Sequence, residues 1–340
     1  MATMETAYLN SVREQLLAGR ARLAEVLAGG EKEHVDRLLN QVDEALQRIE
    51  LGTFGICEEC HTEIGADWLR EDPLTTVCLE HMTRKQQRAL EYDLELAAQI
   101  QKGLLPPCDI AFAGWDICYH YRPAGVVSGD YCDLIPGAGG ELYFVMADVS
   151  GKGVAAAMLG SNLRAVFRSL IPLGLDTAEL VMRANRLFRQ SALPTQYATL
   201  VCGKVTTEGD VETVNAGHLP GLLARGQEIR LLESTSHPLG MFDGQEFCAV
   251  KLQLRPGDTL VLYTDGISEA ENDRGDEYGF ERVKALLQQH VLECPVKLVD
   301  AIKQRLEAFR GRRERFDDET LLAMQYAGRE HATSRVAASA

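Results

Sequence analysis

Three cysteines and one histidine have the spacing of a metal site. Cys57-x2-Cys60 and Cys78-x2-His81 form two pairs separated by seventeen residues. Zinc prefers four sulfur or nitrogen ligands in a tetrahedron, and residues of such a pair can bind one ion from a tight turn. Four protein ligands leave no position for a substrate, so the sequence predicts a structural site. His61, next to Cys60, stays open as a competing ligand with a less suitable spacing.

Four acidic motifs lie later in the chain, each beside an expected strand end. They are Ser128-Gly-Asp130-Tyr-Cys-Asp133, Ala147-Asp148-Val-Ser-Gly-Lys-Gly153, Thr264-Asp265-Gly-Ile-Ser-Glu269 and Phe316-Asp317-Asp318-Glu-Thr320. One such aspartate is commonly a turn former, but four in one domain indicate a site built at strand ends. Two carboxylates near 4 Å would repel by roughly 4 kcal/mol at an effective dielectric near 20. The cluster therefore needs divalent cations, and its oxygen ligands favour magnesium or manganese over zinc.

The elements before the acidic motifs are expected to be helical. A helical hairpin is predicted over residues 1–51, broken at Gly29-Gly30, and a compact loop region over 52–81 holds the two cysteine and histidine pairs. A further helix is predicted over 82–107, because Pro106-Pro107 ends its pattern.

This further helix carries a heptad-like seam. The seam consists of Leu90, Leu94, Ala97, Ile100 and Leu104. Such a narrow apolar stripe is typical of a two-stranded coiled coil, which predicts a homodimer formed through the linker. Packing of the helix against its own domain remains the alternative.

From residue 108 to 326 the pattern changes to strands with helices grouped between them, which favours an α+β sandwich. Expected strands are Trp115–Tyr121, Glu141–Asp148, Ala198–Val205, Val211–Asn215, Phe247–Leu254, Thr259–Tyr263 and Thr320–Gln325. Expected helices cover about 154–171, 177–192, 279–291 and 295–309. The tail over 327–340 is small and polar in composition, so we expect it to be disordered.

Composition narrows the class of protein. The 340 residues carry 35 basic and 50 acidic side chains, a net charge of −15, and the first 105 residues hold 11 basic and 19 acidic ones. Neither part has the basic excess of a DNA-binding surface, so direct DNA binding is disfavoured. The longest apolar runs, such as Leu260–Tyr263, are too short to cross a bilayer, and the N-terminus lacks a signal-peptide core. We therefore expect a cytoplasmic protein without a membrane partner.

The segment LGTFGICEECHTEIGADWLREDPLTTVCLEH, together with the hairpin before it, resembles the DksA/TraR zinc-finger family. The resemblance covers about residues 1–90 and implies one zinc ion on Cys57, Cys60, Cys78 and His81. His81 stands where the family usually has a fourth cysteine. The hairpin tip, residues 28–33, lacks the aspartates that DksA-like factors insert toward the RNA polymerase active centre.

The four acidic motifs, in their order and spacing, resemble the PPM-type metal-dependent serine/threonine protein phosphatases of the SpoIIE/RsbU-like branch. The resemblance covers about residues 95–326 and includes an Ala98–Pro106 motif before the domain, Asn215-Ala-Gly-His218 and Pro238-Leu-Gly240. It implies an α-β-β-α sandwich.

The resemblance also implies two manganese or magnesium ions. Asp148 would bridge them, and the carbonyl of Val149 would help to bind one. Asp265 and Asp317 would complete one site, and Asp130 would support the other directly or through water. Asp318, Asp133 and Glu269 are candidates for a supporting role, and a turn or cap role stays open for the last two.

The implied reaction is attack of a metal-activated water on the phosphorus of a phosphoserine or phosphothreonine. Many larger PPM enzymes have a histidine where Ser150 stands, and Arg122 does not match their phosphate-binding arginine. His218 is interpreted as structural. The resemblance further implies a phosphorylated STAS-type anti-anti-sigma factor as the substrate, in a partner-switching pathway. The alternative is a DksA-like regulator that binds RNA polymerase and carries a secondary or inactive phosphatase fold.

Overall fold

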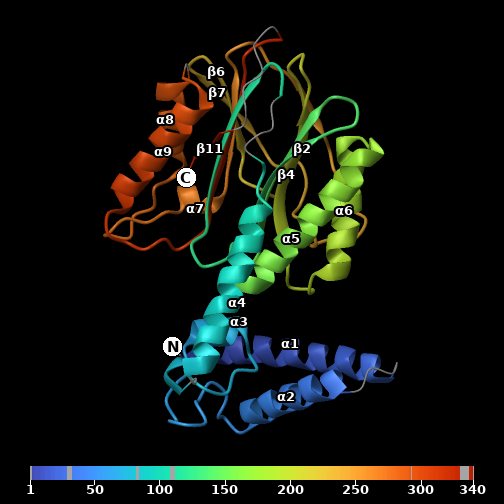
Figure 1. Ribbon diagram of the computed structural model, residues 1–340, viewed down its shortest axis with the longest axis vertical. Coiled ribbons are helices and arrows are strands. Elements are labelled where there is room, and N and C mark those ends of the chain that lie inside the picture. Colours follow the sequence, from blue (N-terminus) through green and yellow to red (C-terminus); the bar gives the residue numbers. More distant parts are fainter. Residues whose placement is uncertain are drawn as a thin grey trace. The chain divides into compact units, whose positions relative to one another are not determined.

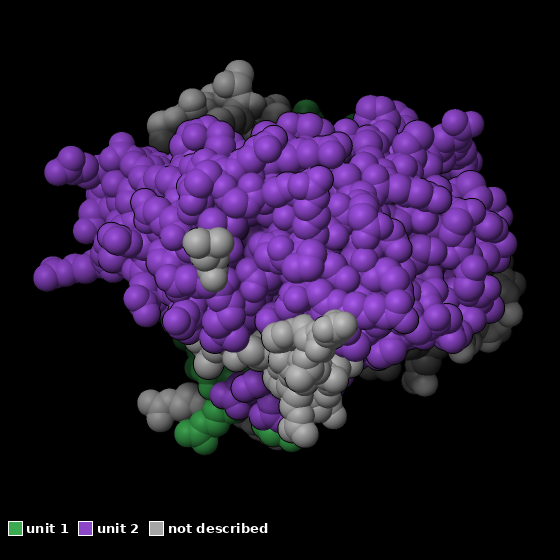
Figure 2. Space-filling model, turned by 90° about the horizontal axis from the view of Figure 1, so that it is seen from above, with its two compact units in different colours: residues 1–93 green, residues 94–340 purple. Residues whose placement is uncertain are grey.

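The computed structural model describes residues 2–28, 33–81, 84–107, 112–291, 293–329 and 337–339. The chain divides into two compact units, residues 1–93 and 94–340, which Figure 2 distinguishes by colour. The division falls inside helix α4 (Arg84–Gly103). The domain boundaries drawn from the sequence remain predictions.

The first unit contains the expected helical hairpin. Helix α1 (Ala2–Ala28) packs against α2 (Glu33–Glu50). Their shared core consists of Val12, Leu16, Val42 and Ala45. Gly29 and Gly30 lie outside the described residues. A short helix α3 (Ala66–Glu71) and the 3-10 turn η1 (Leu79–His81) complete the unit.

The second unit contains two sheets. One has the strand order β11-β1-β10-β9-β6-β7, and the other has the order β2-β3-β4-β5-β8. Neighbouring strands are antiparallel except β1 and β11. The bounds of the first sheet are β11 (Ala337–Ser339), β1 (Trp115–Arg122), β10 (Glu319–Tyr326), β9 (Thr259–Tyr263), β6 (Gly221–Arg225) and β7 (Glu228–Leu232). Those of the second are β2 (Asp130–Pro136), β3 (Leu142–Val149), β4 (Ala198–Val205), β5 (Asp210–Ala216) and β8 (Val250–Gln253).

Helices cover the outer faces of both sheets (Figure 1). Helices α5 (Gly153–Leu170) and α6 (Thr177–Ser191) lie on the second sheet, and α8 (Phe280–His290) and α9 (Pro295–Arg310) lie on the first. Two short elements, η2 (Ile171–Leu173) and α7 (Asp265–Ser268), complete the set. One apolar core lies between the sheets and one lies under each helical layer. The α-β-β-α sandwich is therefore confirmed.

Several elements differ from the sequence-based expectation. Strands β2, β6 and β7 were not expected, and β2 carries two aspartates of the acidic motifs, Asp130 and Asp133. Residues 337–339 form β11 beside β1, whereas the sequence predicted disorder throughout 327–340. Within the described residues, one helical stretch, Gly153–Leu173, is long and apolar enough to cross a membrane by length and composition. Half of it is buried, and α5 packs on β2 and β3, as in a core helix.

Candidate functional site

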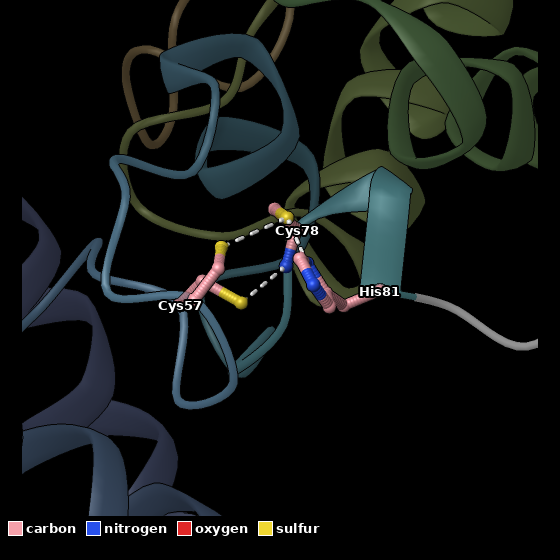
Figure 3. A group of neighbouring side chains, drawn as sticks. Cys57, Cys78 and His81 are labelled. Carbon is pink, nitrogen blue, oxygen red and sulfur yellow. Dashed lines mark hydrogen bonds between the residues drawn. The ribbon is translucent and has the colours of Figure 1, made fainter.

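The four predicted zinc ligands lie together in the first unit, and Figure 3 shows three of them, Cys57, Cys78 and His81. One ligand atom from each of Cys57, Cys60, Cys78 and His81 lies within 4.8 Å of all the others. The sulfur atoms of Cys60 and Cys78 are 3.7 Å apart, close to the roughly 3.8 Å expected between two sulfurs bound tetrahedrally at about 2.3 Å. Nδ1 of His81 lies 3.1 Å from the Cys78 sulfur. This donor set fits a tetrahedral zinc ion, and His61 is not part of it.

The backbone around Cys57 favours its thiolate. Burial raises the pKa of this thiol, but N–H groups of Cys78, Cys60 and Glu59 point at the sulfur and lower the pKa to about 6. The Cys78 N–H donates to the Cys57 sulfur at 3.2 Å. The thiolate is the form that binds metal. The backbone N–H groups of this turn therefore favour the form of Cys57 that can bind zinc.

The acidic motifs meet at one end of the sandwich in the second unit. We call Asp130, Asp148, Asp265, Asp317 and Asp318 the acidic centre. Asp130 begins β2 and lies opposite Asp148 near the end of β3. Asp265 follows β9 as the first residue of α7, and Asp317 and Asp318 precede β10. The structure thus brings the five aspartates together from both sheets.

Charge repulsion marks the acidic centre. Burial, followed by the charges of Asp265, Asp317 and Asp318, raises the pKa of Asp148 to about 7. Burial and then Asp317 raise the pKa of Asp265. Burial, then Asp148 and Asp318, raise the pKa of Asp130. Divalent cations would relieve this repulsion, so the residues present fit the metals that the sequence implies. Among the described residues, only the zinc-type cluster brings three or more ligand atoms within 4.8 Å of one another, so the aspartates are spaced more widely.

Hydrogen bonds fix two of the aspartates. Oδ2 of the buried Asp130 accepts from the hydroxyls of Thr264 at 2.8 Å and Thr320 at 2.5 Å, which joins the two sheets. Asp318 uses both carboxylate oxygens to accept backbone N–H groups, from Ala124 and Gly129, each at 2.8 Å. Asp318 therefore holds the loop before Asp130.

The glycine of the Thr264-Asp-Gly motif allows the segments after β9 and before β10 to approach. A Cβ atom at Gly266 would lie 2.1 Å from the carbonyl oxygen of Asp318. Because the obstacle is backbone, it could not move aside easily. Glycine is therefore required for Asp265 and Asp317 to lie near each other.

Two acidic residues lie apart from the centre. Asp133 is fully buried and pairs with Arg168 of α5, so it anchors that helix. Glu269 is exposed and caps α7, with its N–H donating to the Asp265 carbonyl at 2.7 Å. Burial, then Asp265, Glu277 and Asp317, raise the pKa of Glu269.

Ser150 and His218 are held by neighbouring strands and loops. The Ser150 hydroxyl accepts the Tyr197 N–H at 2.9 Å. His218 is buried between Thr199 and Tyr263, with Nε2 3.1 Å from the Tyr263 carbonyl and Nδ1 2.7 Å from the Thr199 hydroxyl. A carbonyl can only accept, so Nε2 carries the proton. Burial lowers the pKa of His218 to about 4, which agrees with a neutral, structural imidazole.

Sequence reasoning missed two polar side chains around the centre. The Gln101 amide exchanges two hydrogen bonds with the backbone of Ser128, at 2.7 and 2.9 Å. Lys152 forms an ion pair with Asp317. Gln101 lies in the Ala98–Pro106 motif, and Lys152 lies between two glycines. Neither position alone indicates which residue the side chain contacts.

Comparison with known proteins agrees with this arrangement. The sequence model of the family described as Stage II sporulation protein E (SpoIIE) matches residues 138–327. Protein IcfG of Synechocystis is 27% identical over 261 residues, which cover 68% of this chain and 41% of IcfG. Phosphoserine phosphatase RsbU of Bacillus subtilis is 26% identical over 233 residues, covering 67% of this chain and 68% of RsbU. The N-terminal part is similar to RNA polymerase-binding transcription factor DksA of Caulobacter vibrioides, 36% identical over 52 residues, which cover 15% of this chain and 37% of DksA.

Two solved structures share the fold of the second unit. The SiaA-PP2C domain of Pseudomonas aeruginosa matches with a TM-score of 0.61 and 21% identity, over 71% of this chain and 98% of that domain. The RsbU and RsbW domains of Rv1364c from Mycobacterium tuberculosis match with a TM-score of 0.55 and 29% identity, over 66% of this chain and 62% of that one.

Proposed function

The chain belongs to the SpoIIE family, and from this premise we propose that it is a metal-dependent protein phosphatase that acts on phosphoserine or phosphothreonine. The observation that carries the proposal is the acidic centre, where five aspartates from four motifs meet at the ends of two sheets. The similarity to RsbU, which is named a phosphoserine phosphatase, supports the reaction class.

Four aspartates and one carbonyl would hold two manganese or magnesium ions. We assign Asp148 as the ligand common to both, with Asp265, Asp317, Asp130 and the Val149 carbonyl completing the set. When bound, such ions supply an activated water and offset negative charge on the phosphoryl group. Thr264 and Thr320 keep the Asp130 carboxylate in place through its Oδ2. Asp318 orders the loop that precedes Asp130.

The substrate we propose is a phosphorylated STAS-type anti-anti-sigma factor in a partner-switching pathway in the cytoplasm. Support comes from the similarity to RsbU and to a chain that contains RsbU and RsbW domains. The direct test is release of phosphate from a phosphorylated STAS-domain protein in manganese, compared with chelator. Asp148→Asn should lower the rate roughly a thousandfold or more, because a ligand charge is lost at the reacting centre.

A matched control for that test is Asp273→Asn, which makes the same chemical change on an exposed turn. The control should keep full activity. Phosphate release that is equal in chelator, or undiminished in Asp148→Asn, would contradict the proposed function.

The first unit would hold one structural zinc ion on its three cysteines and His81. A homodimer formed through the seam of α4 remains part of the proposal, and among the seam residues Ile100 is 58% exposed. The similarity to DksA favours a second candidate function, binding to RNA polymerase. Retention of core RNA polymerase by the immobilised full chain, lost in Cys57→Ser, would support that second function.

A further inference from the structure

Lys152 contacts the acidic centre although it is not a metal ligand. Its Nζ atom lies 2.9 Å from Oδ2 of Asp317 and 2.6 Å from the carbonyl oxygen of Phe316. The same ammonium lies 4.2 Å from the centre of the Phe316 ring. A side chain from the loop after Asp148 therefore reaches across to the segment that carries another candidate ligand.

The surroundings of Lys152 allow it to change partners. Gly151 and Gly153 on either side have φ angles of +94° and +76°, a region that residues with side chains rarely adopt. The lysine side chain is 51% exposed, and its stem is long and flexible. The ammonium can thus leave Asp317 for a nearby anion without disturbing the core.

The charge of Lys152 acts on several members of the acidic centre. It opposes the rise in pKa of Asp148 and Asp265 that burial and the neighbouring aspartates cause. In the part of the chain that the structure describes, Lys152 is also the cation that forms an ion pair with the centre. A cation in this position is suited to a dianionic phosphoryl group.

Binding of a divalent cation to Asp317 would compete with the ammonium for the same carboxylate. We propose that Lys152 is a substrate-binding residue, which gives up Asp317 when the metal site is filled and then donates to the phosphoryl oxygens. The inference rests on the proposed phosphatase function and extends it. Lys152 then supplies the acidic centre with a cation that binds phosphate. Arg122, by contrast, forms an ion pair with Glu307 at 2.8 Å.

Two equilibrium measurements on the full chain test this inference. The binding of Mn²⁺ without phosphate is followed by electron paramagnetic resonance of the free ion. The binding of inorganic phosphate to the magnesium-loaded protein is followed by calorimetry. Lys152→Met keeps most of the stem and removes the charge. It should bind Mn²⁺ about threefold more tightly, because a half-exposed ion pair is removed, and bind phosphate about tenfold more weakly, because a charge-assisted hydrogen bond is lost.

The conservative and control variants sharpen the result. Lys152→Arg should bind phosphate nearly as well as the unmodified protein, since it keeps the charge. Lys251→Met, at a lysine whose side chain is 79% exposed on β8, should change neither affinity. Unchanged phosphate binding in Lys152→Met, or equal weakening in Lys152→Arg, would overturn the proposal. Neither measurement requires turnover, so a chain that proved inactive on phosphoproteins would refute the proposed function separately.

Discussion

Arg168 of α5 donates two hydrogen bonds, each of 2.8 Å, to the fully buried carboxylate of Asp133 on β2. Arg164, one turn earlier, lies 3.6 Å from the same carboxylate. A buried carboxylate without its partner is strongly destabilising. This pair therefore fixes α5 to the strand that begins with Asp130.

Replacing Arg168 by methionine should lower the free energy of unfolding by about 3 kcal/mol, because the Asp133 charge stays buried with only the more distant Arg164. Urea unfolding at pH 7 measures the change. The matched control is Arg183→Met on α6, whose ion pair with Glu179 is partly exposed and one turn away. It should cost at most about 0.5 kcal/mol. Equal effects of the two substitutions would show that the buried pair contributes no more to the free energy of unfolding than the partly exposed pair does.

The pKa of Asp148 predicts a pH dependence for the metal-free protein. This carboxylate titrates at about 7 in the folded chain and near 4 when unfolded. The folded state therefore keeps a proton that the unfolded chain releases, and stability falls as pH rises between these values, by up to about 4 kcal/mol. Asp148→Asn should remove this loss.

The measurement is urea unfolding of both proteins in chelator at pH 4.5 and pH 7.5. The excess stability of Asp148→Asn over the unmodified protein should grow between the two pH values. The exposed Asp273→Asn serves as control and should show no such growth. A difference that does not depend on pH would argue against the raised pKa.

Cys57→Ser should release zinc from the first unit. Structural zinc contributes on the order of 10–16 kcal/mol of apparent binding energy to a small module, so the segment from 52 to 81 should unfold without it. Elemental analysis should fall from about one zinc per chain to none, while phosphatase activity persists. Cys248→Ser, at an exposed free cysteine, should keep its zinc. Unmodified protein that contains no zinc would refute the assignment.

Leu94→Asp tests the dimer predicted for the linker helix. Two aspartates would face each other in the seam, so the dimer should dissociate at micromolar concentration, as followed by sedimentation velocity. Gln99→Asp introduces the same charge at an exposed position outside the seam and should leave the dimer intact. A dimer that survives Leu94→Asp would place the contact elsewhere.

Gly266→Ala should disturb the acidic centre directly. The added methyl group would overlap the Asp318 carbonyl, so α7 and the start of β10 must separate, and we expect weaker Mn²⁺ binding and a loss of at least about 2 kcal/mol in stability. Gly125→Ala is the control, because its Cβ would meet only Val127 at an ordinary 3.7 Å. Mn²⁺ titration and urea unfolding report both effects.

The sequence allowed the sandwich, the helical hairpin and the grouping of the zinc-type ligands to be predicted, since each has a local pattern. It did not allow β2 to be predicted, because Asp130 and Asp133 interrupt its apolar alternation and Pro136 ends it. The Asp130 carboxylate accepts from hydroxyls distant in sequence, those of Thr264 and Thr320, and the charge of Asp133 is paired with the equally distant Arg168. The metal roles of the aspartates remain predictions.

The two hydrogen bonds between Gln101 and Ser128 affect how the chain could be divided. The Arg164 side chain also donates to the carbonyl of Leu104 at 2.7 Å, and the Tyr119 hydroxyl donates to that of Pro106 at 2.9 Å. A truncated protein that starts after Pro107 would lose all of these contacts. The loop before Asp130 would then lack its two hydrogen bonds to Gln101. The smallest fragment that keeps these hydrogen bonds to the loop before Asp130 must therefore include the last turns of α4.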